Sequence, residues 1–152
     1  MYFVANGFIA VAATKTALIV GSTAAIRPRI CQYAWSTDGT PTSDQGIIVR
    51  LQRATALGTT TAVTPGAPEP SDATAGATVT FGSNATIEPT YTTGAGILWE
   101  QASNPRATIQ WAAYDPRSEF IAPATAANGI GFQMIQAGGS AGNVKVSVGV
   151  YQ

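Results

Sequence analysis

The feature that most constrains this 152-residue sequence is the alternation of apolar and polar residues over residues 143–151. Val144, Val146, Val148 and Val150 occupy every second position there. Because successive side chains of a β-strand point to opposite faces, this period of two places all four valines on one face. The pattern predicts a strand that packs one face on an apolar core.

Similar short apolar runs recur along the chain, and Gly, Pro, Asn, Asp and Ser separate them, as is typical of strands and turns. We expect strands at about residues 16–20, 26–36, 46–55, 60–64, 77–81, 96–100, 107–114, 118–122, 130–136 and 143–151. The sequence therefore predicts an all-β fold, an antiparallel two-sheet sandwich. A jelly roll is the preferred topology. An immunoglobulin-like sandwich is the alternative, although the single cysteine excludes the cysteine pair typical of antibody domains.

The length fits one folding unit. Residues 1–13 are apolar and are interpreted as an N-terminal arm or strand, and residues 14–152 as a single β-sandwich domain. Between about residues 56 and 95 the chain becomes rich in Thr, Ala, Gly and Pro. We interpret that stretch as a long connection inside the domain, because its short apolar segments predict a strand within it.

Charge is unusually sparse. Only 11% of the residues are charged, and eight basic residues balance eight acidic ones. A surface with so little charge is poorly protected against association, which favours a protein that works in an assembly. A monomer with a Ser/Thr-rich polar surface is the alternative. The scattered basic residues predict no nucleic-acid partner, and the apolar runs are too short to predict a membrane span.

The sequence contains no histidine, which excludes Ser-His-Asp and Cys-His catalysis. Cys31 is the one cysteine and lies in an apolar run, where we expect a small, buried and unreactive side chain. Most acidic residues lie beside turn residues and are interpreted as turn formers. We therefore expect no enzyme, no catalytic residue, no cofactor and no metal site, and leave open a calcium site assembled from distant loops.

Aromatic residues supply the candidate partner contacts. Trp35 and Trp111 fall in apolar runs and are expected in the core. Trp99 precedes Glu100-Gln101 and is expected as an exposed aromatic at an interface. The apolar arm adds further candidates, so the predicted partner interface consists of Tyr2, Phe3, Phe8 and Trp99.

In general character the chain resembles the small jelly-roll proteins of tailed bacteriophage particles. The segments that carry the resemblance are Arg27-Pro28-Arg29-Ile30, Trp35-Ser36-Thr37-Asp38-Gly39-Thr40, Val49-Arg50-Leu51-Gln52-Arg53, Glu88-Pro89-Thr90, and Trp111 followed by Asp115-Pro116-Arg117. The resemblance implies a non-enzymatic virion protein, either a decoration (cement) protein that stabilises the head shell or a head or tail attachment module. Its implied partners are the major capsid protein and further copies of itself, as a homotrimer on the capsid surface.

A second hypothesis is a fibre or attachment jelly roll that binds host glycan. Trp99 and Tyr91 are the residues on which a sugar ring would stack in that case. The two hypotheses differ in what they require of the surface. A decoration protein needs a broad contact surface, whereas a glycan-binding module needs an exposed aromatic cleft with carboxylates beside it.

Overall fold

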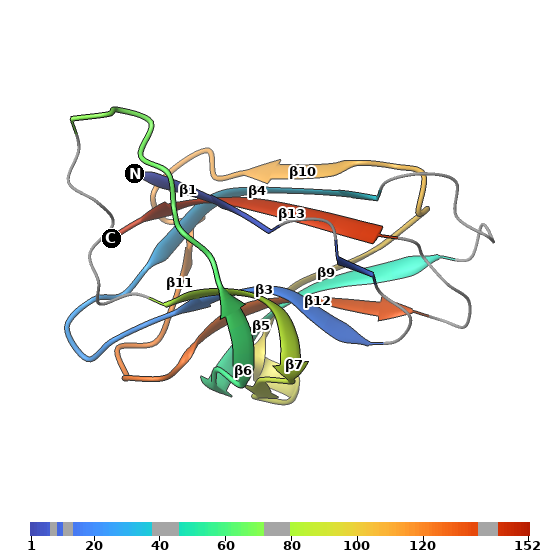
Figure 1. Cartoon of the computed structure of the whole chain (residues 1–152), viewed down its shortest axis with the longest axis horizontal. Helices are drawn as coiled ribbons and strands as arrows, with labels where there is room; N and C mark the ends of the chain where they lie inside the picture. The colour runs from blue at the N-terminus through green and yellow to red at the C-terminus, as the bar shows by residue number, and fades with distance from the viewer. Residues whose placement is uncertain (7–8, 11–13, 38–45, 72–79, 137–142) are drawn as a thin grey trace.

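A computed structural model describes residues 1–6, 9–10, 14–37, 46–71, 80–136 and 143–152 (Figure 1). These residues form thirteen strands and one short 3-10 helix. Their bounds are β1 Tyr2–Ala5, β2 Ile9–Ala10, β3 Lys15–Gly21, β4 Arg29–Thr37, β5 Ile47–Ala56, β6 Thr59–Ala62, β7 Phe81–Ile87, β8 Thr90–Tyr91, η1 Gly94–Gly96, β9 Ile97–Ser103, β10 Ile109–Ala112, β11 Phe120–Ile121, β12 Gly129–Gln136 and β13 Asn143–Tyr151.

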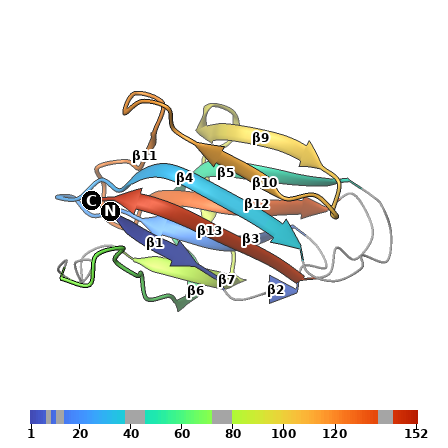
Figure 2. The same cartoon turned by 90° about the horizontal axis from the view of Figure 1, so that it is seen from above.

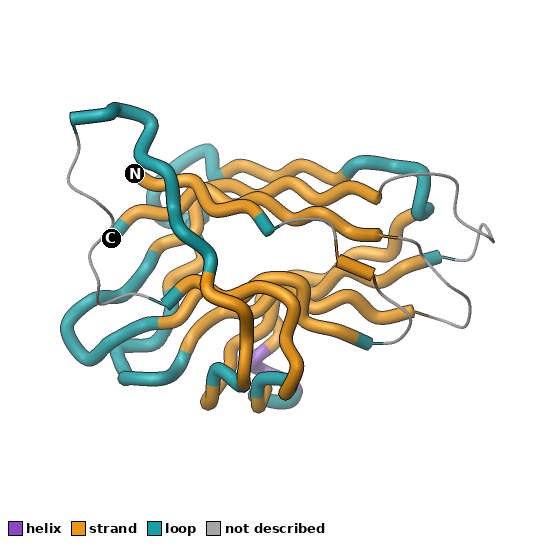
Figure 3. Tube along the Cα trace, in the orientation of Figure 1, coloured by secondary structure: helices purple, strands orange, loops and turns teal. Residues whose placement is uncertain are grey.

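The strands form two sheets that pack face to face (Figures 1 and 3). Sheet A has the order β1-β13-β4-β10, with β2 beside β13 and β11 beside β4. Sheet B has the order β6-β7-β3-β12-β5-β8, with β9 also beside β5. Neighbouring strands are antiparallel throughout both sheets. The predicted all-β antiparallel sandwich is confirmed.

Eight of the strands form four nested pairs: β1 with β13, β3 with β12, β4 with β10, and β5 with β9. Such nesting is what one long hairpin gives when it is wrapped around a core. Of these eight strands, sheet A contains β1, β4, β10 and β13, and sheet B contains β3, β5, β9 and β12. A jelly roll is also eight strands in two sheets. The jelly-roll topology stays a prediction, and the nesting agrees with it. Strands β6, β7 and β8 are additions between β5 and β9.

The core lies between the inner faces of the two sheets. The four alternating valines of β13 are each at most 1% exposed, as their period of two requires. Opposite them, β3, β5 and β12 contribute Leu18, Leu51 and Phe132, which are likewise at most 1% exposed. Burying one such side chain stabilises the fold by about 1.5–3 kcal/mol, so these residues stabilise the packing of the two sheets.

The first strand belongs to sheet A. Tyr2–Ala5 pairs with β13 in regular register, and Val4 is fully buried against the core. After β6 the chain crosses the edge of the sandwich, where Phe3 and Gly66 exchange two backbone hydrogen bonds of 2.8 Å. We call residues 63–66 the edge segment. It covers the outer edge of β1, so the described part of the expected arm is an integral strand of the sandwich.

In the part of the chain that the structure describes, no helix is long and apolar enough to cross a membrane.

Candidate functional site

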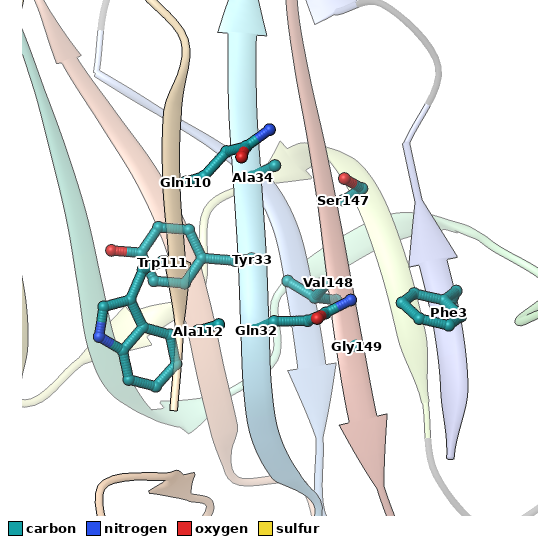
Figure 4. Close-up of a pocket in the computed structure, with 10 residues that line it drawn as sticks. All are labelled: Phe3, Gln32, Tyr33, Ala34, Gln110, Trp111, Ala112, Ser147, Val148 and Gly149. Atoms are coloured by element: carbon teal, nitrogen blue, oxygen red, sulfur yellow. The ribbon is translucent and has the colours of Figure 1, made fainter. Parts of the chain in front are cut away.

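The outer face of sheet A carries a hollow of about 350 Å³ (Figure 4). Two rows of side chains cross it from strand to strand. The strand register places Phe3, Gly149, Gln32 and Ala112 in one row, and Ala5, Ser147, Ala34 and Gln110 in the next. We call these eight residues the outer face. Small side chains fill its centre, so the hollow follows from the choice of Gly, Ser and Ala on three adjacent strands.

The outer face carries no ionisable side chain. Phe3 forms one border and is 39% exposed. Gln32 and Gln110 supply the larger polar groups, each with an amide that can both donate and accept hydrogen bonds. Small uncharged residues around a hollow allow another surface to approach closely, and the nearest charge on this face of β13 is the exposed Lys145, which pairs with Ser36. The outer face offers no group for acid, base or nucleophilic chemistry.

A second feature is an aromatic cluster of Tyr33, Trp99, Trp111, Phe120 and Phe132. The Tyr33 ring lies 5.3 Å from Trp99, edge to face, and 5.4 Å from Trp111, nearly parallel. Trp99 comes from β9 and Trp111 from β10, which are the edge strands of the two sheets on one side of the sandwich (Figure 2). Both tryptophans are half-buried there.

The Tyr33 hydroxyl is buried without a hydrogen-bond partner among the described residues. Loss of water around it raises the pKa of Tyr33. The hydroxyl is therefore held as a neutral phenol. Because no hydrogen bond offsets the loss of its hydration, its burial costs free energy.

Tyr91 lies on the opposite, outer face of sheet B. Its hydroxyl is 2.6 Å from the Thr16 hydroxyl, and the Glu88 carboxylate accepts hydrogen bonds from the backbone N–H and the hydroxyl of Thr16. Burial is the main cause that raises the pKa of Tyr91. This arrangement attaches the β7–β8 segment to β3. The Tyr91 hydroxyl is thus engaged in a hydrogen bond with Thr16 that stabilises the fold.

Ion pairs join charged side chains in both sheets. Arg29 Nε lies 2.6 Å from Glu119 Oε2, and the Glu119 side chain is only 8% exposed. Arg50 pairs with Glu100 across β5 and β9. Among the described residues no three His, Cys, Asp or Glu side chains gather where they could hold a metal ion.

Cys31 is half-buried at a bulge between β4 and β13. Its thiol donates to the Gly149 carbonyl at 3.3 Å and lies 3.9 Å from the Met1 sulfur. Burial raises the pKa of the Cys31 thiol, which disfavours the nucleophilic thiolate.

The structure separates the residues that were predicted to form a partner interface. Phe3 borders the outer face and Tyr2 packs at the margin of the core. Trp99 belongs to the aromatic cluster. Phe8 lies outside the described residues. The other outer-face residues were not among the candidates. Alternation along residues 31–36 and 143–151 indicates which of them face away from the core, but only the pairing of β4, β10 and β13 brings them together.

Trp99 and Tyr91 do not form one stacking platform. Trp99 pairs with Leu51, whose side chain faces the core, whereas the Tyr91 hydroxyl lies over Gly131 on the outer side of the same sheet. The two rings thus lie on opposite faces of sheet B.

Comparison with known proteins finds no match of this chain to any protein-family model, to any curated protein or to any solved structure.

Proposed function

We propose that this chain is a non-enzymatic structural protein of a virus particle, a decoration protein that binds the major capsid protein on the capsid surface and stabilises the head shell. The observation that carries the proposal is the outer face of sheet A. It is uncharged, hollowed at its centre and bordered by the exposed ring of Phe3. Such a surface suits a broad contact with another protein, in which small residues let two surfaces approach closely.

The energetic logic is mass action. A protein that binds only the assembled shell lowers the free energy of that state, by about 4 kcal/mol when its free concentration is a thousand times the dissociation constant. Few charges are needed for such a contact, in agreement with the 11% of charged residues in the chain. The glycan-binding alternative gains no support from Trp99 and Tyr91, because they do not share a face.

Co-sedimentation with undecorated shells of the virus that encodes this chain tests the proposal. We expect the parent chain to sediment with the shells and Ala34→Arg to remain in the supernatant, because a long charged side chain then fills the hollow. Ala62→Arg is the matched control, since Ala62 is exposed on β6 of the other sheet.

Binding by Ala62→Arg together with loss of binding by Ala34→Arg supports the proposal. A parent chain that ignores the shells, or an Ala34→Arg chain that binds as well as the parent, contradicts it. A glycan array probed with the parent chain then tests the attachment-module alternative.

A further inference from the structure

The two long sides of the sandwich are closed to different degrees. On one side the edge segment covers β1, and the outermost strand of sheet B is β6, which has only four residues and an irregular pairing. On the other side lie β9 and β10 (Figure 2). Strand β9 has seven residues and pairs only with β5, so among the described residues no strand covers its second edge.

An uncovered strand edge presents a row of backbone N–H and C=O groups to any chain that can pair with it. Short edge strands and bulges weaken that tendency, and β9 has one irregularity, between its pairs with Leu51 and Gln52. Beyond it, residues 99–103 pair regularly with β5. Glu100, the one charge in this stretch, is already held by Arg50 of the neighbouring strand. These five residues thus form a regular strand edge whose only charge is paired.

We propose that a second copy of this chain adds to this edge, so that β9 pairs with β9 of the second copy in antiparallel fashion about a two-fold axis at Gln101. Residues directly opposite each other in antiparallel strands point to the same face of the sheet. A two-fold axis perpendicular to the sheet must therefore lie between the two copies of one residue, and not between two successive positions of the strand. With Gln101 at the axis, Glu100 lies opposite Ala102 of the second copy, and Trp99 lies opposite Ser103 of the second copy.

This register is favoured by charge and by burial. An axis at Glu100 would place two carboxylates directly opposite each other, which is destabilising. The axis at Gln101 instead pairs two neutral amides that can hydrogen-bond to each other. It also covers the half-buried Trp99 at the open side of the aromatic cluster. Pairing about a two-fold axis produces a closed dimer. We therefore propose a dimer in place of the homotrimer that was expected from the sequence.

Light scattering coupled to size-exclusion chromatography tests the inference. The parent chain is expected at twice the chain mass of 15.6 kDa. Gln101→Lys and Gln101→Glu are each expected at the single-chain mass, because each places like charges opposite one another across the axis. An equimolar mixture of the two variants is expected to recover the double mass, since opposite charges then meet. This recovery also shows that both variants are folded.

Gln110→Lys and Gln110→Glu are the matched controls, because Gln110 is exposed on the outer face of sheet A. Both are expected to keep the double mass. A monomeric or trimeric parent overturns the inference, as does a dimer that neither Gln101 variant dissociates or a mixture that stays at the single-chain mass. The inference concerns a different surface from the proposed function, and shell binding by a monomer would support that function while overturning the inference.

Discussion

Gly131 lies beneath the hydroxyl of Tyr91, at the centre of sheet B. A Cβ added at this glycine would come 2.1 Å from the Tyr91 oxygen, closer than any real contact. Gly131→Ala is therefore expected to displace the ring from Thr16 and to lower the free energy of unfolding by about 1–3 kcal/mol. Urea denaturation measures this loss.

The control for that substitution is Gly46→Ala. The nearest atom to a Cβ at Gly46 lies 3.8 Å away, an ordinary contact, and we expect a change within about 0.5 kcal/mol. Equal stability of the Gly131→Ala chain and the parent would contradict the proposed contact with Tyr91.

The buried Tyr33 and the half-buried Tyr91 predict how stability depends on alkaline pH. Burial raises the pKa of Tyr33 and of Tyr91 above the value of about 10 that a solvated tyrosine has. The folded protein thus keeps protons that the unfolded chain releases. The free energy of unfolding keeps its full value below about pH 10. As the pH rises from there toward the folded-state pKa, it falls by about 1.4 kcal/mol per pH unit for each group.

Urea denaturation between pH 9 and pH 11 measures this slope. Tyr91→Phe is expected to remove the contribution of one of the two groups. Tyr114→Phe is the matched control for the loss of a tyrosine hydroxyl, because the Tyr114 side chain is 90% exposed. A Tyr91→Phe slope equal to that of the parent would show that Tyr91 is not buried as described.

At the scale of elements, Asn6 joins the two sheets. It is 2% exposed, its amide donates to the Ala17 carbonyl at 3.2 Å, and its side-chain oxygen accepts from the Val146 N–H at 2.6 Å. Asn6→Ala leaves two buried backbone groups without these partners, and we expect a loss of about 1–3 kcal/mol in the free energy of unfolding. Unchanged thermal and urea denaturation of Asn6→Ala would contradict this role.

The N-terminal segment also shows where sequence patterns stop being informative. Residues 2–5 carry no polar alternation that distinguishes a strand from an arm, and only their pairing with β13 and Gly66 assigns them to the sandwich. Deletion of residues 1–13 removes β1 and Asn6 together. We expect it to destabilise the fold, which urea denaturation measures.

Prediction succeeded where one face of a strand is buried. The bounds of β13 agree with the expected residues 143–151, and β12 begins one residue before the expected start. In the Thr/Pro-rich region the strand was expected at residues 77–81, of which the structure describes residues 80–81, whereas β7 spans Phe81–Ile87. Its Gly-Ser-Asn centre has no apolar alternation. It forms a strand because its backbone pairs with β3 and because Thr60 packs over Gly82.

The candidate site was harder to predict because it belongs to no single segment. Ala34, Gln110 and Ser147 become neighbours through pairings between strands more than thirty residues apart. Trp99 shows the converse. Its polar sequence neighbours suggested exposure, but the ring is half-buried because Tyr33 of the other sheet lies 5.3 Å from it.

At the scale of the whole molecule, the sparse charge and two separate surfaces both favour a protein that works in an assembly. The outer face of sheet A is proposed to contact the shell, and the β9 edge to contact a second copy. A chain with zero net charge gains little from electrostatic repulsion as a free particle. In the assembled particle the same surface composition is an advantage, since close contacts cost little desolvation of charge.

The most direct test of the structural role is a density map of shells with the chain bound. We predict that the sandwich is seen on the capsid surface with Phe3, Ala34 and Ser147 turned toward the major capsid protein. A map in which the shells carry no added density, or in which the sandwich contacts the shell through the outer side of sheet B, would contradict the account.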